Sequence, residues 1–351
     1  MSRRIRLVWF LPFGVPILFA CMVVFLLWDD YRPRPAAPSS PPHEILVNRS
    51  QLNLLASFQV CVAGAVNDNA LLALDHRLVY LYSDGTPFGP RLRLQDLYEA
   101  SPTWESGETP HPFSMAASDD TLFLSSSLEV RAYSLANGEL LWQNMVLPGH
   151  TGNVIAQATG QGVTVYYTQD NPVTREATVL TLDPASGDVI TKTSYPCQEC
   201  ARMAPLLSNG VLWIGTEHIW RSSSPTDDAL WRIDSRPRIA LWPVEYEHLI
   251  IFSSGFFPSI YAIDAATGST AWQDDREFAS LPVVFRGLLY SITRDSTLSE
   301  LDPSTGSQLG FIQFSPLEPE IGSRSNLYAL ASSDEILAAY FGDSCQILVF
   351  N

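Results

Sequence analysis

From residue 45 onward, short runs of β-branched, aromatic and aliphatic residues alternate with short polar turns. Runs of about four to eight residues bounded by turn residues are typical of β-strands. No long segment of this region repeats its apolar positions with the 3.6-residue period of a helix. The pattern therefore predicts that residues 45–351 are all-β.

Four segments of this region share one arrangement, in which a strand is followed by a short turn that ends in Gly and by a second strand. They read VRAYSLANGELLW at 130–142, VLTLDPASGDVI at 179–190, IYAIDAATGSTAW at 260–272 and LSELDPSTGSQLGF at 298–311. Asp or Asn in such a turn can hydrogen-bond its own backbone two residues on, and Gly supplies the positive φ that closes it. We therefore predict antiparallel hairpins with turns at Gly138, Gly187, Gly268 and Gly306.

Weaker copies and a second kind of hairpin accompany these four. The weaker copies are LWRIDSRPRIALW at 230–242 and VYLYSDGT at 79–86, and the second kind occurs as APLLSNGVLWIGT at 204–216 and LPVVFRGLLYSIT at 281–293. One hairpin of each kind makes a four-stranded unit of about 40 to 50 residues, which is the period of propeller blades. The count predicts a β-propeller of about seven four-stranded blades, with roughly six to eight possible.

Two of the repeats have a more specific pattern. AYSLANGELLW at 132–142 and AIDAATGSTAW at 262–272 resemble the tryptophan-docking repeat of the quinoprotein-like (PQQ-like) propellers, which reads Ala-x-Asp-x-x-x-Gly-x-x-x-Trp. In that family the Trp packs between adjacent blades. The resemblance implies that Trp142, Trp242 and Trp272 dock neighbouring blades here. Several copies lack the Trp, so the repeats leave the blade boundaries open.

The N-terminal part of the chain has a different pattern. Residues 7–28 read LVWFLPFGVPILFACMVVFLLW without a charge, and as a helix they span about 33 Å, enough to cross a bilayer core. Arg3, Arg4 and Arg6 precede this run and favour a cytoplasmic N-terminus. We expect a cytoplasmic segment at 1–6, a single transmembrane helix at 7–28, a Pro-rich stalk at 29–44 and the propeller at 45–351, outside the cytoplasm.

Two alternatives to a retained transmembrane helix stay open. A cleaved signal peptide would require a small-x-small site, which does not follow the apolar run. Residues 18–21 read LFAC and resemble a lipoprotein cleavage box, although Phe19 is bulky and the apolar run continues beyond Cys21. The stalk reads YRPRPAAPSSPP at 31–42, and its prolines favour an extended polyproline II spacer.

Charge narrows the range of partners. The chain has 37 acidic and 21 basic residues and a formal net charge of -16. Phosphate backbones would be repelled, so nucleic acid is not expected as a partner. The acidic residues are spread along the chain without runs, as on an ordinary solvated surface.

Four cysteines follow the apolar run. Cys197 and Cys200 form a C-x-x-C, for which a local disulfide is favoured over a redox pair or half of a zinc site. Cys61 lies in the first strands and Cys345 in the last. A circular propeller brings the two chain ends together, so we predict a ring-closing disulfide between Cys61 and Cys345, with two buried free thiols as the alternative.

Candidate chemistry is sparse. The six histidines are scattered without metal-ligand spacing, and neither a G-x-S-x-G elbow nor a glycine-rich phosphate loop occurs. We therefore predict no catalytic residue, no metal site and no cofactor site.

Function is inferred from the resemblance. Non-enzymatic quinoprotein-like propellers serve as scaffolds, whereas the enzymes of the family oxidise alcohols or sugars. Those enzymes are much longer, and they have a calcium site and a disulfide between adjacent cysteines, which this chain lacks. The resemblance implies a protein-binding or scaffold module, and the uncharged run at 7–28 places it at the membrane and outside the cytoplasm. The alternatives are a quinone-dependent dehydrogenase and a sensor that binds a small ligand in the propeller channel.

Overall fold

A computed structural model gives the fold of the chain. The residues that it describes are 45–48, 50–60, 71–82, 90–99, 101–109, 112–118, 120–126, 129–145, 154–159, 162–171, 176–195, 206–208, 211–215, 218–222, 232–234, 243–253, 259–314, 328–342 and 345–351. Within these ranges every regular element is a strand, and no helix is long and apolar enough to cross a membrane. The predicted all-β fold is confirmed. The predicted transmembrane helix at 7–28 and the stalk at 29–44 lie outside the described residues.

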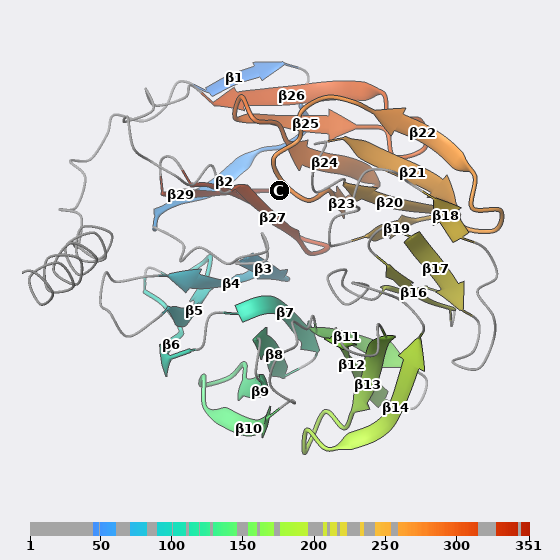
Figure 1. Cartoon of the computed structure of the whole chain (residues 1–351). Helices are drawn as coiled ribbons and strands as arrows, with labels where there is room; N and C mark the ends of the chain where they lie inside the picture. The colour runs from blue at the N-terminus through green and yellow to red at the C-terminus, as the bar shows by residue number, and fades with distance from the viewer. Residues whose placement is uncertain are drawn as a thin grey trace, which may run out of the picture.

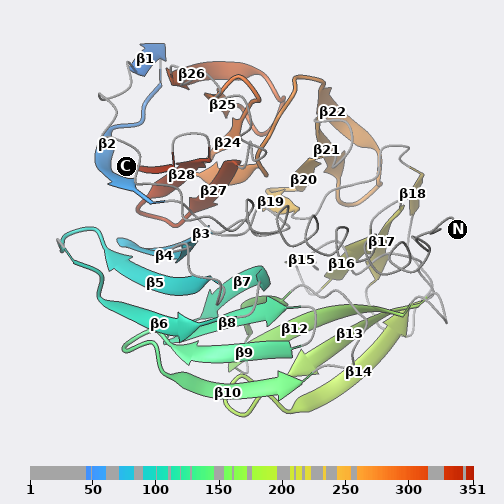
Figure 2. The ribbon, with the colours of Figure 1, turned by 60° about the vertical axis from the view of Figure 1, so that its left-hand side comes forward.

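The described strands form seven antiparallel sheets that are arranged around a common centre (Figures 1 and 2). Five sheets each contain four strands that are consecutive in the sequence. In order, they consist of β3 (Leu71–Leu74), β4 (Arg77–Tyr82), β5 (Arg91–Asp96) and β6 (Trp104–Glu108); β7 (Pro112–Ser118), β8 (Thr121–Ser126), β9 (Glu129–Ser134) and β10 (Leu140–Met145); β11 (Val154–Thr159), β12 (Gly162–Asn171), β13 (Glu176–Leu182) and β14 (Val189–Tyr195); β15 (Leu206–Ser208), β16 (Val211–Gly215), β17 (His218–Ser222) and β18 (Arg232–Asp234); and β19 (Val244–Tyr246), β20 (Leu249–Ser253), β21 (Ile260–Asp264) and β22 (Thr270–Asp274).

The last two sheets each combine strands from the two ends of the propeller region. One sheet contains β23 (Val283–Phe285), β24 (Leu288–Ile292), β25 (Thr297–Leu301) and β26 (Gln308–Phe314), with β1 (Ile45–Asn48) as a fifth strand beside β26. The other contains β27 (Tyr328–Ser332), β28 (Leu337–Phe341) and β29 (Gln346–Phe350), with β2 (Leu54–Gln59) beside β29. The prediction that every unit has four strands is therefore wrong for the sheet that β1 joins.

The first strand of each sheet lies toward the centre of the ring (Figure 2). Contacts between these inner strands follow the chain order: β3 contacts β7, β7 contacts β11, β19 contacts β23, and β23 contacts β27. β27 in turn contacts β3, so the last sheet lies against the first.

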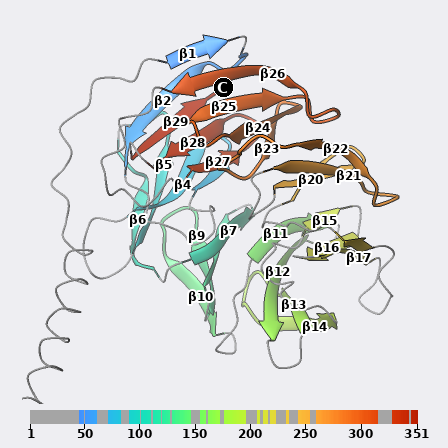
Figure 3. The same cartoon turned by 45° about the horizontal axis from the view of Figure 1, so that its top comes forward.

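Ring closure depends on the N-terminal strands. β2 pairs with β29 antiparallel, and the backbones of Asn53 and Asn351 exchange two hydrogen bonds of 3.0 Å. β1 pairs with the preceding sheet, with Ile45 opposite Phe314 and Asn48 opposite Phe311. Figure 3 shows β1 along β26 and β2 along β29. Both ends of the propeller region therefore contribute to closing it, which leaves fewer exposed sheet edges.

Burial explains why the apolar pattern differs between strands. Every residue of β20 and β28 is buried, because the middle strands of a sheet are covered by neighbouring sheets on both faces. The outer strands β10 and β22 expose most of their residues and bury Trp142 and Trp272. The core thus lies between adjacent sheets, and a middle strand reads as a continuous apolar run.

The Gly-ended turns have one conformation. Gly138, Gly187, Gly268 and Gly306 have φ between 72° and 75°, in the left-handed region that favours Gly. In each of these turns the Gly N–H donates to the backbone carbonyl four residues earlier, at 2.8 Å. These contacts explain the spacing of Asp and Gly in the repeats.

Candidate binding groove between two sheets

Three tryptophans connect neighbouring sheets in the same way. The indole N–H of Trp142 on β10 donates to the carbonyl of Pro184 at 2.8 Å, and that of Trp272 on β22 donates to the carbonyl of Pro303 at 2.9 Å. Each indole ring also lies over the turn glycine of the following sheet, where an added Cβ would approach ring carbons to 2.4 Å at Gly187 and 2.6 Å at Gly306.

The third tryptophan was missed by sequence reasoning. The indole N–H of Trp104 on β6 donates to the carbonyl of Leu135 at 2.8 Å, and its ring lies over Gly138. The residue four positions before Trp104 is Ala100, so the Gly-x-x-x-Trp signal is absent there. Trp242, which was predicted to dock blades, lies outside the described residues.

Of the four predicted disulfide cysteines, the structure describes one. Cys345 is disulfide-bonded, and its carbonyl accepts a hydrogen bond of 2.7 Å from the backbone N–H of Val60. Cys61, which follows Val60 directly, lies outside the described residues, as do Cys197 and Cys200.

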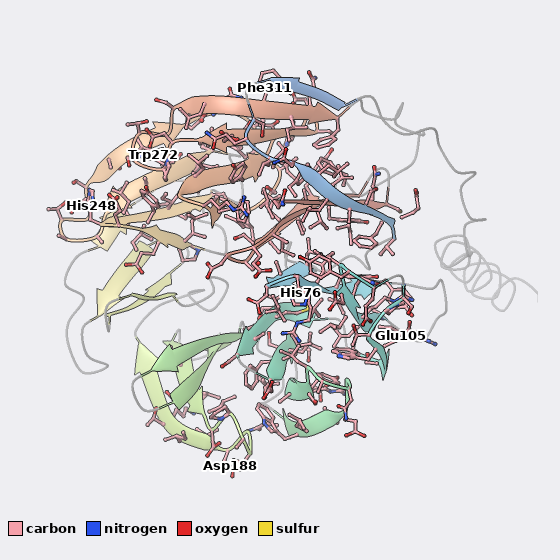
Figure 4. All side chains as sticks on the ribbon, turned by 180° about the vertical axis from the view of Figure 1, so that it is seen from behind. His76, Glu105, Asp188, His248, Trp272 and Phe311 are labelled. Carbon is pink, nitrogen blue, oxygen red and sulfur yellow. The ribbon has the colours of Figure 1, made fainter. Side chains whose placement is uncertain are left out.

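An open groove of about 440 Å³ lies between the sheet of β19–β22 and the five-stranded sheet. Its floor is the face of β25 and β26 that is turned toward the preceding sheet, and its walls are the segment after β22 and the turn between β24 and β25. Figure 4 labels Phe311 of the floor on β26 and Trp272 on the neighbouring β22. The lining residues are Arg276, Glu277, Thr293, Arg294, Asp295, Thr297, Ser299, Gln308, Phe311 and Gln313.

The floor of the groove belongs to a column of residues, by which we mean residues that lie directly opposite one another on adjacent strands. In the five-stranded sheet, Ser291, Ser299 and Phe311 stand side by side across β24, β25 and β26. Ser299 and Phe311 line the groove, whereas Ser291 is buried beside them and does not.

The corresponding columns of other sheets contain larger residues. They are Tyr80, Arg93 and Glu105 across β4, β5 and β6; Leu124, Arg131 and Gln143 across β8, β9 and β10; and Phe252, Tyr261 and Gln273 across β20, β21 and β22. In each of these three sheets, the residue of the column on the outer strand directly follows the docking Trp. Successive side chains of a strand point to opposite faces, so this residue points away from the following sheet, on which the Trp docks, and toward the preceding sheet. Ser299, which lines the groove, therefore stands at a position where these three sheets have Arg or Tyr.

Ser299 is fully buried at the floor of the groove, and its hydroxyl has no hydrogen-bond partner. A buried hydroxyl without a partner costs about 1 to 3 kcal/mol relative to a satisfied one. Neighbouring Ser291 differs, because its hydroxyl donates to the carbonyl of Ser280 at 3.2 Å. The Ser299 hydroxyl therefore lies unpaired beneath the surface of the groove.

The walls of the groove hold charges of both signs. Arg276 is neutralised by Asp274, whose carboxylate oxygens both lie 3.0 Å from its Nε, and it also donates to Gln308 at 2.6 Å. Arg294 lies 3.4 Å from Glu277, with 59% and 66% of the two side chains exposed. An exposed ion pair at this separation is worth little and exchanges readily with other partners. The groove thus offers hydrogen-bonding groups around the aromatic ring of Phe311.

The described residues contain no group of three or more His, Cys, Asp and Glu that could hold a metal ion. The groove itself offers a phenyl ring, an exposed ion pair and a buried hydroxyl without a partner.

Comparisons with known proteins agree on the fold. The chain matches the family model described as outer membrane protein assembly factor BamB over residues 126–248 and 215–340, which together span more than half of the chain. No curated protein matches the chain.

Solved structures with the same fold include BamB from Moraxella catarrhalis, with 13% identity, a TM-score of 0.57 and coverage of 86% of this chain and 99% of that one. BBS1N in complex with ARL6DN has 10% identity, a TM-score of 0.63 and coverage of 86% and 97%. The WD40 β-propeller domain of Doa1 has 13% identity, a TM-score of 0.58 and coverage of 86% and 96%. At these identities the likeness shows the propeller fold.

Proposed function

Because the chain belongs to the PQQ-like repeat β-propeller family of the outer membrane protein assembly factor BamB, we propose that it is a membrane-anchored scaffold that binds a protein partner outside the cytoplasm. Membership of this family is the observation that carries the proposal, since the family is described by a role in assembling other proteins. The BBS1N propeller, whose structure is of a complex with ARL6DN, is a further case of this fold beside a protein partner.

The groove between the sheet of β19–β22 and the five-stranded sheet is the surface that we assign to the partner. It is open and contains a phenyl ring and hydrogen-bonding groups of both kinds, which are features of protein interfaces. Its floor includes β26, the strand beside which β1 lies.

Membrane attachment is part of the same proposal. The uncharged run at 7–28 would anchor the chain with residues 1–6 in the cytoplasm, and the prolines of 29–44 would hold the propeller away from the bilayer. Protease treatment of cells whose outer envelope has been opened while the plasma membrane stays closed, and of lysed cells, tests this orientation. We expect digestion of the propeller region in both samples, and its full protection behind a closed plasma membrane would contradict the proposal.

Proximity labelling tests the scaffold role directly. A peroxidase fused after Asn351, supplied with biotin-phenol and hydrogen peroxide, should label a defined set of proteins in cells that make the full chain. The matched control is residues 1–44 fused to the same peroxidase, which keeps the anchor and removes the propeller. Proteins labelled only by the full chain should also co-purify with it after cross-linking. Identical labelling by both fusions would overturn the scaffold proposal.

A further inference from the structure

The column that contains Ser299 in the five-stranded sheet has a counterpart in each of the three other sheets compared above. In two of those sheets, the counterpart of Ser299 is an arginine. In the sheet of β3–β6, the guanidinium of Arg93 lies 4.1 Å from the ring centroid of Tyr82 and 2.8 Å from a carboxylate oxygen of Glu105. In the sheet of β7–β10, Arg131 lies 2.7 Å from Glu129 and donates to the hydroxyl of Tyr133 at 3.4 Å. Both guanidinium groups thus meet an aromatic residue and a carboxylate on this face.

The groove has the same kinds of neighbours, but no arginine stands at this position of the column. The two arginines of its lining, Arg276 and Arg294, are paired with Asp274 and Glu277. Ser299 takes the position of Arg93 and Arg131 in the five-stranded sheet. Phe311 stands beside it, and the carboxylates of Glu277 and Asp295 line the groove. A guanidinium in this space would face an aromatic ring and acceptor oxygens, as the two intramolecular guanidinium groups do.

The Ser299 hydroxyl has no partner and can accept a hydrogen bond as well as donate one. It is therefore compatible with a guanidinium, which has five N–H donors and no acceptor. Arg276 does not compete for the floor, because Asp274 and Gln308 hold it. The formal charge of -16 would also draw a basic segment toward the propeller.

We propose that the groove binds an arginine side chain presented by an extended segment of a protein partner, in the place that Arg93 and Arg131 occupy in their own sheets. This inference rests on the proposed protein-binding function and names the chemistry of the partner. Lysine would fit less well, because its ammonium is compact and cannot stack as a plane on Phe311.

Binding of short capped peptides tests the proposal. The full-length protein in detergent micelles is titrated with acetyl-Arg-Arg-Arg-amide and with acetyl-Lys-Lys-Lys-amide, and the dissociation constants are measured by calorimetry. We expect the arginine peptide to bind about tenfold more tightly, the size of one favourable cation–π or charge-assisted contact. Equal dissociation constants would mean that the two peptides bind only through general attraction to an acidic protein, and this would overturn the proposal.

Two variants locate the binding. Ser299→Arg lets the chain fill its own groove and should abolish the preference for the arginine peptide. Ser304→Arg adds the same charge at an exposed turn position of the same sheet and should keep it. If Ser299→Arg does not fold, Phe311→Leu provides the test. It removes the aromatic ring and should lower the preference for the arginine peptide several-fold. A folded Ser299→Arg or Phe311→Leu protein that keeps the full preference would refute the assignment.

The same variants separate this inference from the proposed function. If proximity labelling finds partners of the full chain and Ser299→Arg leaves their binding intact, the scaffold role stands and the arginine groove does not. If the fusion of the full chain labels no more proteins than the fusion of residues 1–44, the scaffold role is refuted, and the peptide affinities do not change that result.

Discussion

The indole ring of Trp272 lies over Gly306 of the following sheet so closely that an added Cβ would come within 2.6 Å of a ring carbon. The two residues belong to different sheets, and the indole N–H completes the contact by donating to the carbonyl of Pro303 at 2.9 Å. The glycine therefore serves two purposes, because it closes a hairpin turn at a φ of +73° and leaves room for the ring that docks the neighbouring sheet.

Gly306→Ala should destabilise the propeller by about 2 to 4 kcal/mol, since it adds a steric clash with Trp272 to the strain of a left-handed alanine. Gly287→Ala is the matched control: Gly287 has a φ of +78°, but nothing lies within 4 Å of its added Cβ. The control should cost only about 1 to 2 kcal/mol. Urea denaturation of both variants measures the difference, and equal losses would show that the ring contact contributes no stability.

Glu300→Gln should loosen the N-terminal strands. The buried carboxylate of Glu300 accepts hydrogen bonds from the Ser50 hydroxyl at 3.2 Å and from the Gln51 backbone N–H at 3.4 Å, between β1 and β2. Tyr290 also donates to it at 3.2 Å. Burial and the nearby carboxylate raise the pKa of Tyr290, so its phenol remains a donor at neutral pH.

An amide in place of this carboxylate turns one acceptor oxygen into a donor. The variant should therefore show faster hydrogen exchange in residues 45–59, measured by mass spectrometry, with exchange in β20 and β28 unchanged. Glu335→Gln is the control, because that side chain is 57% exposed. Unchanged exchange in residues 45–59 would contradict a clamping role for Glu300.

Cys345 should be linked to Cys61. Cys345 is disulfide-bonded, and its carbonyl binds the N–H of Val60, the residue before Cys61. Non-reducing peptide mapping should recover the two cysteines in one cross-linked pair and Cys197 with Cys200 in another. Cys345→Ser should lower the free energy of unfolding by about 2 to 4 kcal/mol, since the bridge constrains a long loop of the unfolded chain. A map that pairs Cys345 with a different cysteine would reject the ring-closing bridge.

Asp264 should titrate at an unusually low pH. Hydrogen bonds to its carboxylate, first from the backbone N–H of Thr267 and then from the hydroxyl of Thr267, lower its pKa below the ordinary value of 3.8. The stabilisation from a lowered pKa is fully present above the unfolded-state pKa and is lost as the pH falls through the folded-state pKa. The turn should therefore weaken as the pH falls through the lowered pKa of Asp264.

NMR titration of the Asp264 carboxyl carbon measures this pKa. Thr267→Val removes the hydroxyl and leaves the backbone N–H, so the pKa should rise partway toward 3.8. A wild-type pKa at or above 3.8 would contradict the proposed cause.

The sequence by itself determined the hairpins and the class of fold. Turns such as Asp183 to Gly187 and Asp264 to Gly268 depend on contacts within about five residues, between a carboxylate, nearby backbone N–H groups and a glycine with positive φ. The period of these turns indicated a propeller, and the Gly-x-x-x-Trp spacing pointed to Trp142 and Trp272 because both belong to such a repeat.

Only the tertiary structure decided the contacts between distant segments. The pairing of β1 with β26 and of β2 with β29 joins strands more than 200 residues apart, and a short strand has no local signal that selects its partner. Trp104 lacks the repeat signature, so its docking became visible only from its contact with Gly138. The floor of the groove depends on Ser299 and Phe311 standing opposite each other on β25 and β26. Strand pairing decides which residues face each other in this way, and neighbours in the sequence do not show it.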